Sequence, residues 1–139
     1  MKRRKIADRF LLALVGIMIV GTAGSIRVHA NNSADKSYRL SYYGDGGDVR
    51  TGYYAKTDDT SVYIKHMGDV GAWVSIRVKG SEKNFTWSGN YVDVPLGRGY
   101  KMANNVWETY GRRVDVYLRL SPTTHSPCTI HGLWSADSV

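Results

Sequence analysis

Cysteine is nearly missing from this chain: among 139 residues there is only Cys128. A single cysteine excludes a disulfide within the chain, so the fold must be held together by the packing of its core. Cys128 is then either a free thiol or one half of a disulfide between two copies. We expect a monomer, with a dimer linked through Cys128 as the alternative.

Signatures of catalysis and of helices are missing as well. No glycine-rich phosphate loop follows a strand pattern, and no Ser, His and acid set stands in a nucleophile turn. No stretch has the amphipathic period of a helix. These absences favour an all-β protein that is not an enzyme and that uses no cofactor.

The one long apolar run covers residues 10–20. Basic residues precede it at positions 2–5 and 9, and small residues lead from it to Val28-His29-Ala30. This order predicts a Sec-type signal peptide, 1–30, that is cleaved after Ala30 so that the protein is secreted. The run is shorter than the ~20 residues that span a bilayer. A signal that is retained as a membrane anchor is the alternative.

Removal of residues 1–30 takes away most of the positive charge. The whole chain carries a formal net charge of +7, and the signal holds six of its 19 Lys and Arg residues and one of its 12 Asp and Glu residues. The remaining 13 basic and 11 acidic residues give a net charge of +2. This balance argues against nucleic acid as a partner, and membrane contact is expected only through an uncleaved signal.

Alternation of apolar and polar residues predicts three strands, in 62–65, 74–79 and 113–121. Weaker strand patterns cover 38–43, 52–56, 85–87, 91–94, 106–110 and 129–134. Turn-forming Gly, Asn and Asp residues separate them at intervals of about ten residues. The sequence therefore predicts a flexible tail over 31–37, followed by a single antiparallel β-sandwich of about seven to nine short strands over 38–139.

One short segment, Thr129-Ile130-His131-Gly132-Leu133-Trp134, resembles the first active-site motif of the T2 family of secreted ribonucleases. The resemblance would make His131 one member of an acid and base pair. However, the family's second motif, His-Glu-x-x-Lys-His-Gly, is missing, and only five residues follow Trp134. We therefore interpret the match as coincidental.

A second resemblance covers roughly residues 55–139. It is carried by Thr57-Asp58-Asp59-Thr60-Ser61-Val62-Tyr63, by Asn104-Asn105-Val106-Trp107-Glu108-Thr109-Tyr110-Gly111 and above all by the ending Gly132-Leu133-Trp134-Ser135-Ala136-Asp137-Ser138-Val139. The chain resembles an uncharacterised family of small secreted proteins from Gram-positive bacteria that end in Gly-x-Trp-Ser-Pro-Asp-Ser. Ala136 stands where that family has proline. The resemblance implies export, and it implies no activity, ligand or site residue.

The tryptophan of this ending has two interpretations. Trp134 can be a buried cap on the sandwich edge, with Asp137 and Ser138 accepting bonds from nearby backbone groups. Alternatively the C-terminus is disordered and Trp134 is an exposed anchor for a partner. We expect the buried cap and keep the anchor open.

Two groups of side chains have the chemistry of metal ligands. The first group consists of His125, Cys128 and His131. On a strand Cys128 would face away from the two histidines, so these residues could bind zinc or copper only if they lay together in a loop. The second consists of turn carboxylates that could hold calcium; they are Asp45, Asp48, Asp58 and Asp59. Asp residues in turns usually bond to their own backbone, so we expect no metal site.

Aromatic residues outnumber what a core of this size needs, so some must be exposed. Tyr53 and Tyr54 would face opposite ways on a strand, and Tyr117 falls on the polar side of its strand. An aromatic platform of Tyr53 and Tyr117 would fit sugar rings. Together with Trp134, the possible exposed anchor, they are the candidate binding residues. Alternatively, the tyrosines form cross-strand pairs on a half-exposed sheet face.

These features together predict a secreted, non-enzymatic β-sandwich that binds an unknown extracellular or cell-envelope ligand. Two modes of action stay open: a glycan-binding module, and a small bacteriocin-like or toxin-like antagonist. A hydrolase is a third possibility, and it would require a deep cleft with paired carboxylates or histidines.

Overall fold

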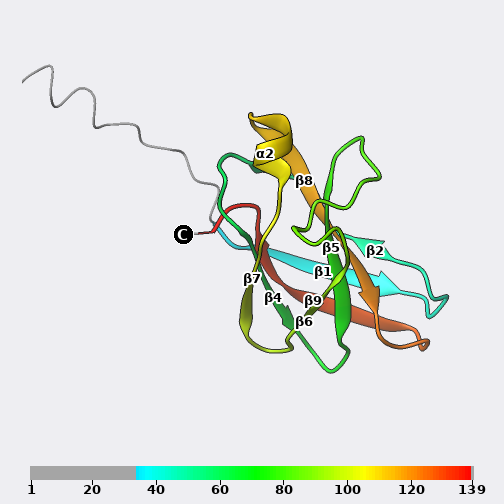
Figure 1. Cartoon of the computed structure of the whole chain (residues 1–139). Helices are drawn as coiled ribbons and strands as arrows, with labels where there is room; N and C mark the ends of the chain where they lie inside the picture. Colours follow the sequence, from blue (N-terminus) through cyan, green and yellow to red (C-terminus); the bar gives the residue numbers. More distant parts are fainter. Residues whose placement is uncertain (1–33, 139) are drawn as a thin grey trace, which may run out of the picture.

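A computed structural model describes residues 34–138 as two antiparallel sheets that pack face to face (Figure 1). The first sheet contains, in spatial order, β1 (Lys36–Tyr42), β9 (Cys128–Ser135), β4 (Val62–Met67) and β7 (Gly99–Met102). The second contains β2 (Val49–Arg50), β8 (Val114–Pro122), β5 (Ala72–Val78) and β6 (Val92–Val94), and β3 (Tyr54–Lys56) also pairs with β8. The predicted β-sandwich is confirmed. The predicted signal peptide lies outside the described residues.

The second sheet is built on the two clearest alternating patterns of the sequence. β5 and β8 pair over seven positions, with Val74 opposite Leu120 and Ile76 opposite Leu118. All four of these side chains are fully buried, because the period of two directs them to the same face. The predictions of strands around 74–79 and 113–121 are therefore confirmed.

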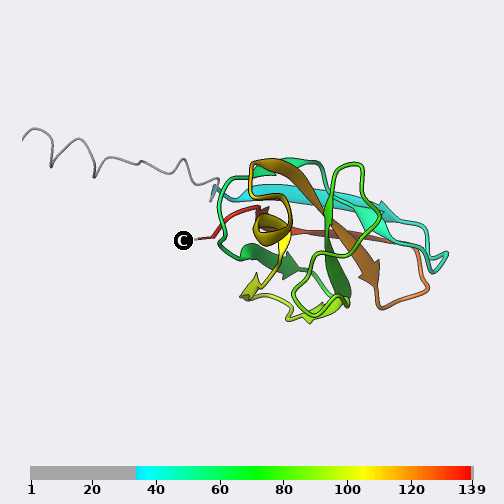
Figure 2. The ribbon, with the colours of Figure 1, turned by 45° about the horizontal axis from the view of Figure 1, so that its top comes forward.

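The first sheet is built on β1 and β9, which lie side by side along the length of the sandwich (Figure 2). Their register places Lys36 opposite Trp134 and Tyr42 opposite Cys128. Because Lys36 and Ser37 already belong to this strand pair, the predicted flexible tail over 31–37 is too long by at least these two residues.

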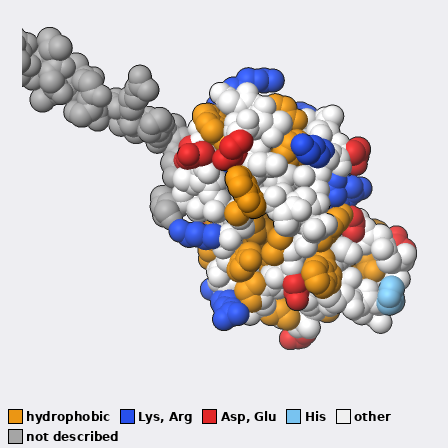
Figure 3. Space-filling view, viewed as in Figure 1, with side chains coloured by type: hydrophobic (Ala, Val, Ile, Leu, Met, Phe, Trp, Pro, Cys, Tyr) orange, Lys and Arg blue, Asp and Glu red, His pale blue; other side chains and the backbone are white. Residues whose placement is uncertain are grey.

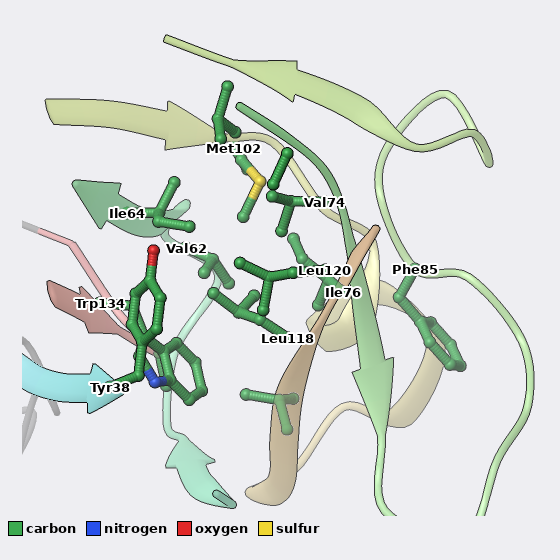
Figure 4. Close-up of a cluster of buried hydrophobic side chains, with 14 of the residues drawn as sticks. Tyr38, Val62, Ile64, Val74, Ile76, Phe85, Met102, Leu118, Leu120 and Trp134 are labelled. Carbon is green, nitrogen blue, oxygen red and sulfur yellow. The ribbon is translucent and has the colours of Figure 1, made fainter. Parts of the chain in front are cut away.

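The core lies between the sheets, and both contribute side chains to it (Figure 4). Trp134 from the first sheet and aliphatic residues from the second sheet fill it at less than 2% exposure. Burial of one large apolar side chain stabilises a fold by roughly 1.5–3 kcal/mol, so this layer holds the sheets together without a disulfide.

Two predicted strands are wrong. Residues 106–110 form a short helix, α2 (Val106–Tyr110), which lies at one end of the sandwich (Figure 1). Val106 is buried and Tyr110, one turn later, packs on Phe85 with 5.7 Å between ring centroids, so the pattern has the period of a helix. Gly111 ends the helix in the left-handed conformation, at φ 61°. Residues 85–87 form a loop with a single bridge, Thr86 to Asn104.

Two strands, β2 and β7, escaped prediction. β7 reads Gly-Tyr-Lys-Met, so its alternation rests on only two apolar residues, and β2 has only two residues in all. Both are short outer strands of their sheets. No helix in the described part of the chain is long and apolar enough to cross a membrane.

Candidate functional site

The C-terminal motif serves the fold. Trp134 has 0% exposure and its ring centroid lies 5.1 Å from that of Tyr54. Trp134 is therefore the buried cap, and its alternative role as an exposed anchor is wrong. As a fully buried core side chain, it cannot be one of the surface binding residues.

Gly132 of the same motif makes room for a buried polar contact. Tyr38, Gly132 and His66 lie in one row across β1, β9 and β4. The Tyr38 hydroxyl passes over Gly132 and lies 2.6 Å from Nδ1 of His66. A Cβ atom at Gly132 would clash with that hydroxyl and with the carbonyl oxygen of Lys65. The glycine is therefore required by close approach of a neighbouring side chain and backbone.

The hydrogen bonds of His66 fix its tautomer. Nε2 lies 2.8 Å from the carbonyl oxygen of Val70, which can only accept, so Nε2 carries the proton. Nδ1 then accepts from the Tyr38 hydroxyl. Burial lowers the pKa of His66, against the opposing effect of the Val70 bond, and His131 lowers it further. Burial also raises the pKa of Tyr38. Both groups are neutral at pH 7 and serve as a structural pair.

A buried ion pair joins the C-terminal segment to the second sheet. Nζ of Lys56 on β3 lies 2.8 Å from Oδ1 of Asp137, and neither side chain is exposed. Nζ also donates to the carbonyl oxygens of Thr60 and Ala136, at 2.6 and 3.0 Å. Asp137 accepts from the backbone N–H and the hydroxyl of Thr57. All three ammonium protons are used, which is the condition for such a pair to be tolerated in a core.

The described residues contain no group of three or more His, Cys, Asp or Glu side chains that could hold a metal ion. Two of the turn carboxylates bond locally, as expected for Asp in turns: Asp45 accepts from the backbone N–H of Gly47, and Asp58 accepts from that of Thr60. Cys128 is a half-buried free thiol on β9, and His125 lies in the turn before this strand.

The predicted aromatic platform is only partly exposed. Tyr53 is 43% exposed, whereas Tyr117 is 6% exposed, so the prediction that Tyr117 offers a binding surface is wrong. Their rings meet edge to face, with centroids 5.4 Å apart and planes at 88°. Lys79 lies 5.1 Å from the Tyr53 centroid. The two tyrosines form a packed cross-strand contact, and they do not present two coplanar rings.

Paired polar groups cover the centre of the outward face of the second sheet. Nε of Arg119 lies 3.2 Å from Asp48, which also accepts a 2.6 Å hydrogen bond from the hydroxyl of Tyr91. Arg77, only 8% exposed, donates to Ser75 and to the backbone carbonyl of Glu82. These charges are largely satisfied within the protein.

Exposed apolar side chains lie at a different surface, the edge of the sandwich formed by β7, the outer strand of the first sheet, and β6, the outer strand of the second sheet. We call it the aromatic rim, and it consists of Trp73, Trp87, Leu96 and Tyr100, which are 47%, 66%, 42% and 38% exposed. Trp73 on β5 pairs with Asp93 on β6, and the backbone N–H of Trp87 bonds to Ala103, just after β7. Figure 3 shows hydrophobic side chains gathered over this region.

The rim borders a shallow hollow of about 470 Å³. Asp93 contributes a carboxylate and Arg98 a guanidinium to this hollow, and Pro95, Gly99 and Tyr100 complete the lining. Trp73 and Trp87 belong to the predicted excess of aromatic residues. Leu96 and Tyr100 were not predicted, because their exposure depends on β7 being an outer strand, and its four residues are too few to give a clear strand pattern.

Comparison with known protein families gives a match that covers most of the chain. The profile of a family described as proteins of unknown function, DUF2712, matches residues 26–138. No curated protein and no solved structure matches the chain. The matched region includes both sheets and the C-terminal motif, and the chain therefore belongs to the DUF2712 family of proteins of unknown function.

Proposed function

We propose that this protein is an exported, non-enzymatic domain that binds a glycan of the cell envelope. The observation that carries the proposal is the aromatic rim with its hollow. Four large apolar side chains stand exposed at one edge of the sandwich. Exposed apolar groups that gather in one place, next to polar ones, mark interaction sites more often than scattered single residues do.

The chemistry of the rim fits a sugar better than a purely apolar ligand. Trp73, Trp87 and Tyr100 offer ring faces, and Asp93 and Arg98 offer an acceptor and a donor beside them. Aromatic rings cover the apolar faces of sugars, while charged side chains bond their hydroxyl groups. The hollow is open and shallow, which suits one stretch of a long polymer.

Two further observations support binding without catalysis and outside the cell. The hollow holds one carboxylate, Asp93, whereas hydrolysis of a glycosidic bond by the common mechanism uses two. The N-terminal sequence has the order of an export signal. Export places the rim where envelope polymers occur.

The test is a pull-down of the protein on insoluble peptidoglycan, after expression of the full chain in a Gram-positive host. N-terminal sequencing of the product tests export, with Asn31 as the expected first residue. We expect saturable binding that falls about tenfold, or ~1.4 kcal/mol, in a Trp87→Ala variant and similarly in Tyr100→Ala.

The matched control is Tyr43→Ala, which removes a more exposed aromatic ring, 79% accessible, outside the rim. Its binding should equal that of the unaltered protein. The proposal fails if the folded protein does not bind, or if the rim variants bind as well as the control.

A further inference from the structure

The outward face of the first sheet carries basic residues and no acidic ones. Its outward positions on the four strands are Ser37, Arg39, Ser41, Tyr63, Lys65, Met67, Gly99, Lys101, Thr129, His131, Leu133 and Ser135. None of these is Asp or Glu, and each strand contributes one basic side chain. We call these four residues the basic stripe: Arg39 on β1, His131 on β9, Lys65 on β4 and Lys101 on β7.

The register arranges the stripe in single file. Arg39 pairs with His131, Lys65 lies one strand over and two residues along, and Lys101 lies one further strand over and two further residues along. With strands ~4.8 Å apart and a rise of ~3.3 Å per residue, neighbours are about 5–8 Å apart and the stripe is about 19 Å long. The four basic residues therefore form a diagonal line across the whole sheet.

Two members of the stripe keep their charge available. Among the described residues no ion pair joins Arg39 or Lys65 to a carboxylate, whereas the arginine on β8 of the other sheet has two such partners. Arg39 is exposed and Lys65 is half-buried. Aligned positive charges on a sheet face whose outward strand positions hold no acid raise the local concentration of anions.

The shape and composition of this face select the kind of anion. The apolar residues between the cations, Tyr63, Met67 and Leu133, are half-buried, and none of the exposed large hydrophobic side chains occupies an outward strand position of this sheet. The face therefore lacks groups that would enter a bilayer. A single file of cations fits a chain with regularly repeated charge, and arginine and lysine are the usual partners of phosphate oxygens.

We propose that the basic stripe binds a linear polymer of phosphate groups, laid diagonally across the first sheet. This site is separate from the aromatic rim and does not rest on the function proposed for it. The stripe is not visible in the sequence, because its members lie 26 to 92 positions apart in the chain and only the strand register aligns them.

The test is a titration of the full-length protein with long-chain inorganic polyphosphate at several salt concentrations. Three permanently charged contacts predict that the logarithm of the binding constant falls with that of the salt concentration with a slope of about −2. Neutralisation of one contact, in Lys65→Gln, should reduce the slope by about 0.7. The double variant Arg39→Glu/Lys65→Glu should lose at least tenfold in affinity at low salt.

The control makes the same change of charge at another basic site. Arg112 and Arg113 are exposed and lie beside Lys79 in a hollow of about 380 Å³. Arg112→Glu/Arg113→Glu should bind polyphosphate within about twofold of the unaltered protein. The proposal is overturned if this variant loses affinity and the stripe variant does not, or if both lose it equally. It is also overturned if polyphosphate does not bind while anionic phospholipid vesicles or polyglutamate do. Circular dichroism of each variant confirms that it is folded.

Discussion

The outward faces of the two sheets treat charge in opposite ways. On the second sheet, Asp48 and Glu82 pair with Arg119, and Tyr91 adds a hydrogen bond to Asp48, so most of the electrostatic interaction is internal. On the first sheet, the basic stripe has no acidic neighbour at any outward strand position. Ion pairs on the outward face of the second sheet contribute modestly to the stability of the fold. Like charges on the outward face of the first sheet repel one another, which lowers stability but leaves them available to a ligand.

The inward faces of the two sheets differ as well: here the first sheet carries more polar groups near its centre than the second. The centre of the second sheet, β5 and β8, presents aliphatic residues such as Val74, Ile76 and Leu118, and its buried Lys56 lies at the edge, on β3. The first sheet presents Trp134 together with the neutral Tyr38 and His66 pair. Aliphatic packing tolerates substitutions that conserve volume, whereas a buried polar contact fails when one partner is removed. The first sheet should therefore be the more sensitive to mutation inside and the less sensitive outside.

The largest expected effect is at the ion pair that joins the two sheets. Asp137→Ala leaves the buried ammonium of Lys56 with only the more distant carboxylate of Asp58, at 3.8 Å, and we expect a loss of about 3–5 kcal/mol in the free energy of unfolding. Urea denaturation followed by tryptophan fluorescence measures this loss. The control, Asp59→Ala, removes an exposed carboxylate from the neighbouring loop and should change stability by less than about 0.5 kcal/mol. Equal effects of the two substitutions would contradict the structural role of Asp137.

The next effect is at Gly132, where the row formed by Tyr38 and His66 leaves no room for a side chain. Gly132→Ala should destabilise the protein by about 1–3 kcal/mol through overpacking. The matched control is Gly52→Ala, where a Cβ atom would meet nothing within 4 Å. Thermal melts of both variants provide the comparison. If Gly132→Ala melts with the unaltered protein, Tyr38 does not cross over Gly132 in solution.

The two sheets differ in how far sequence patterns could predict them. The second sheet was predictable because one face of β5 and β8 is aliphatic and the other polar, and this contrast produces a clear period of two. The inward row of the first sheet reads Tyr38, Gly132 and His66, which no scale of hydrophobicity marks as a core. The role of the glycine depends on which strands become neighbours, and that information is not local.

The candidate surfaces were less predictable than the fold for the same reason. Tyr117 has a polar-face position in its strand, but packing of Tyr53 against it leaves it buried. Trp87 and Tyr100 reach the rim from a loop and from an outer strand that is too short to be predicted. The helix at 106–110 was misread because five residues are too few to distinguish its period from that of a strand.

A direct test of the contrast between the outward faces removes one cation from each. Arg77→Met leaves Ser75 and the Glu82 carbonyl without their charged donor, and we expect a loss of about 1.5–3 kcal/mol in stability. Lys65→Met should change stability by less than about 0.5 kcal/mol. Chemical denaturation of both variants in the same buffer gives the comparison. Similar losses in both would mean that Lys65 is as much a part of the fold as Arg77.

The smallest expected effect is the pH dependence that arises from His66. Burial lowers the pKa of His66 from 6.5, so the folded state holds the neutral ring and the unfolded state takes up the proton first. Neutral His66 therefore contributes its full stability above pH 6.5, and this contribution is lost as the pH falls through the lowered pKa of the folded state. The charged form would also lose its hydrogen bond from Tyr38, since Nδ1 could no longer accept.

Denaturation curves between pH 7.5 and 5 measure this dependence, because the ordinary pKa of 6.5 for the unfolded ring lies within that range. A His66→Gln variant should be less stable at pH 7.5 and should show a flatter dependence, because the titrating group is gone. His125→Gln, in the exposed turn before β9, should keep the slope of the unaltered protein. If His125→Gln flattens the curve and His66→Gln does not, acid sensitivity comes from the surface, and the inward faces of the two sheets respond alike to pH.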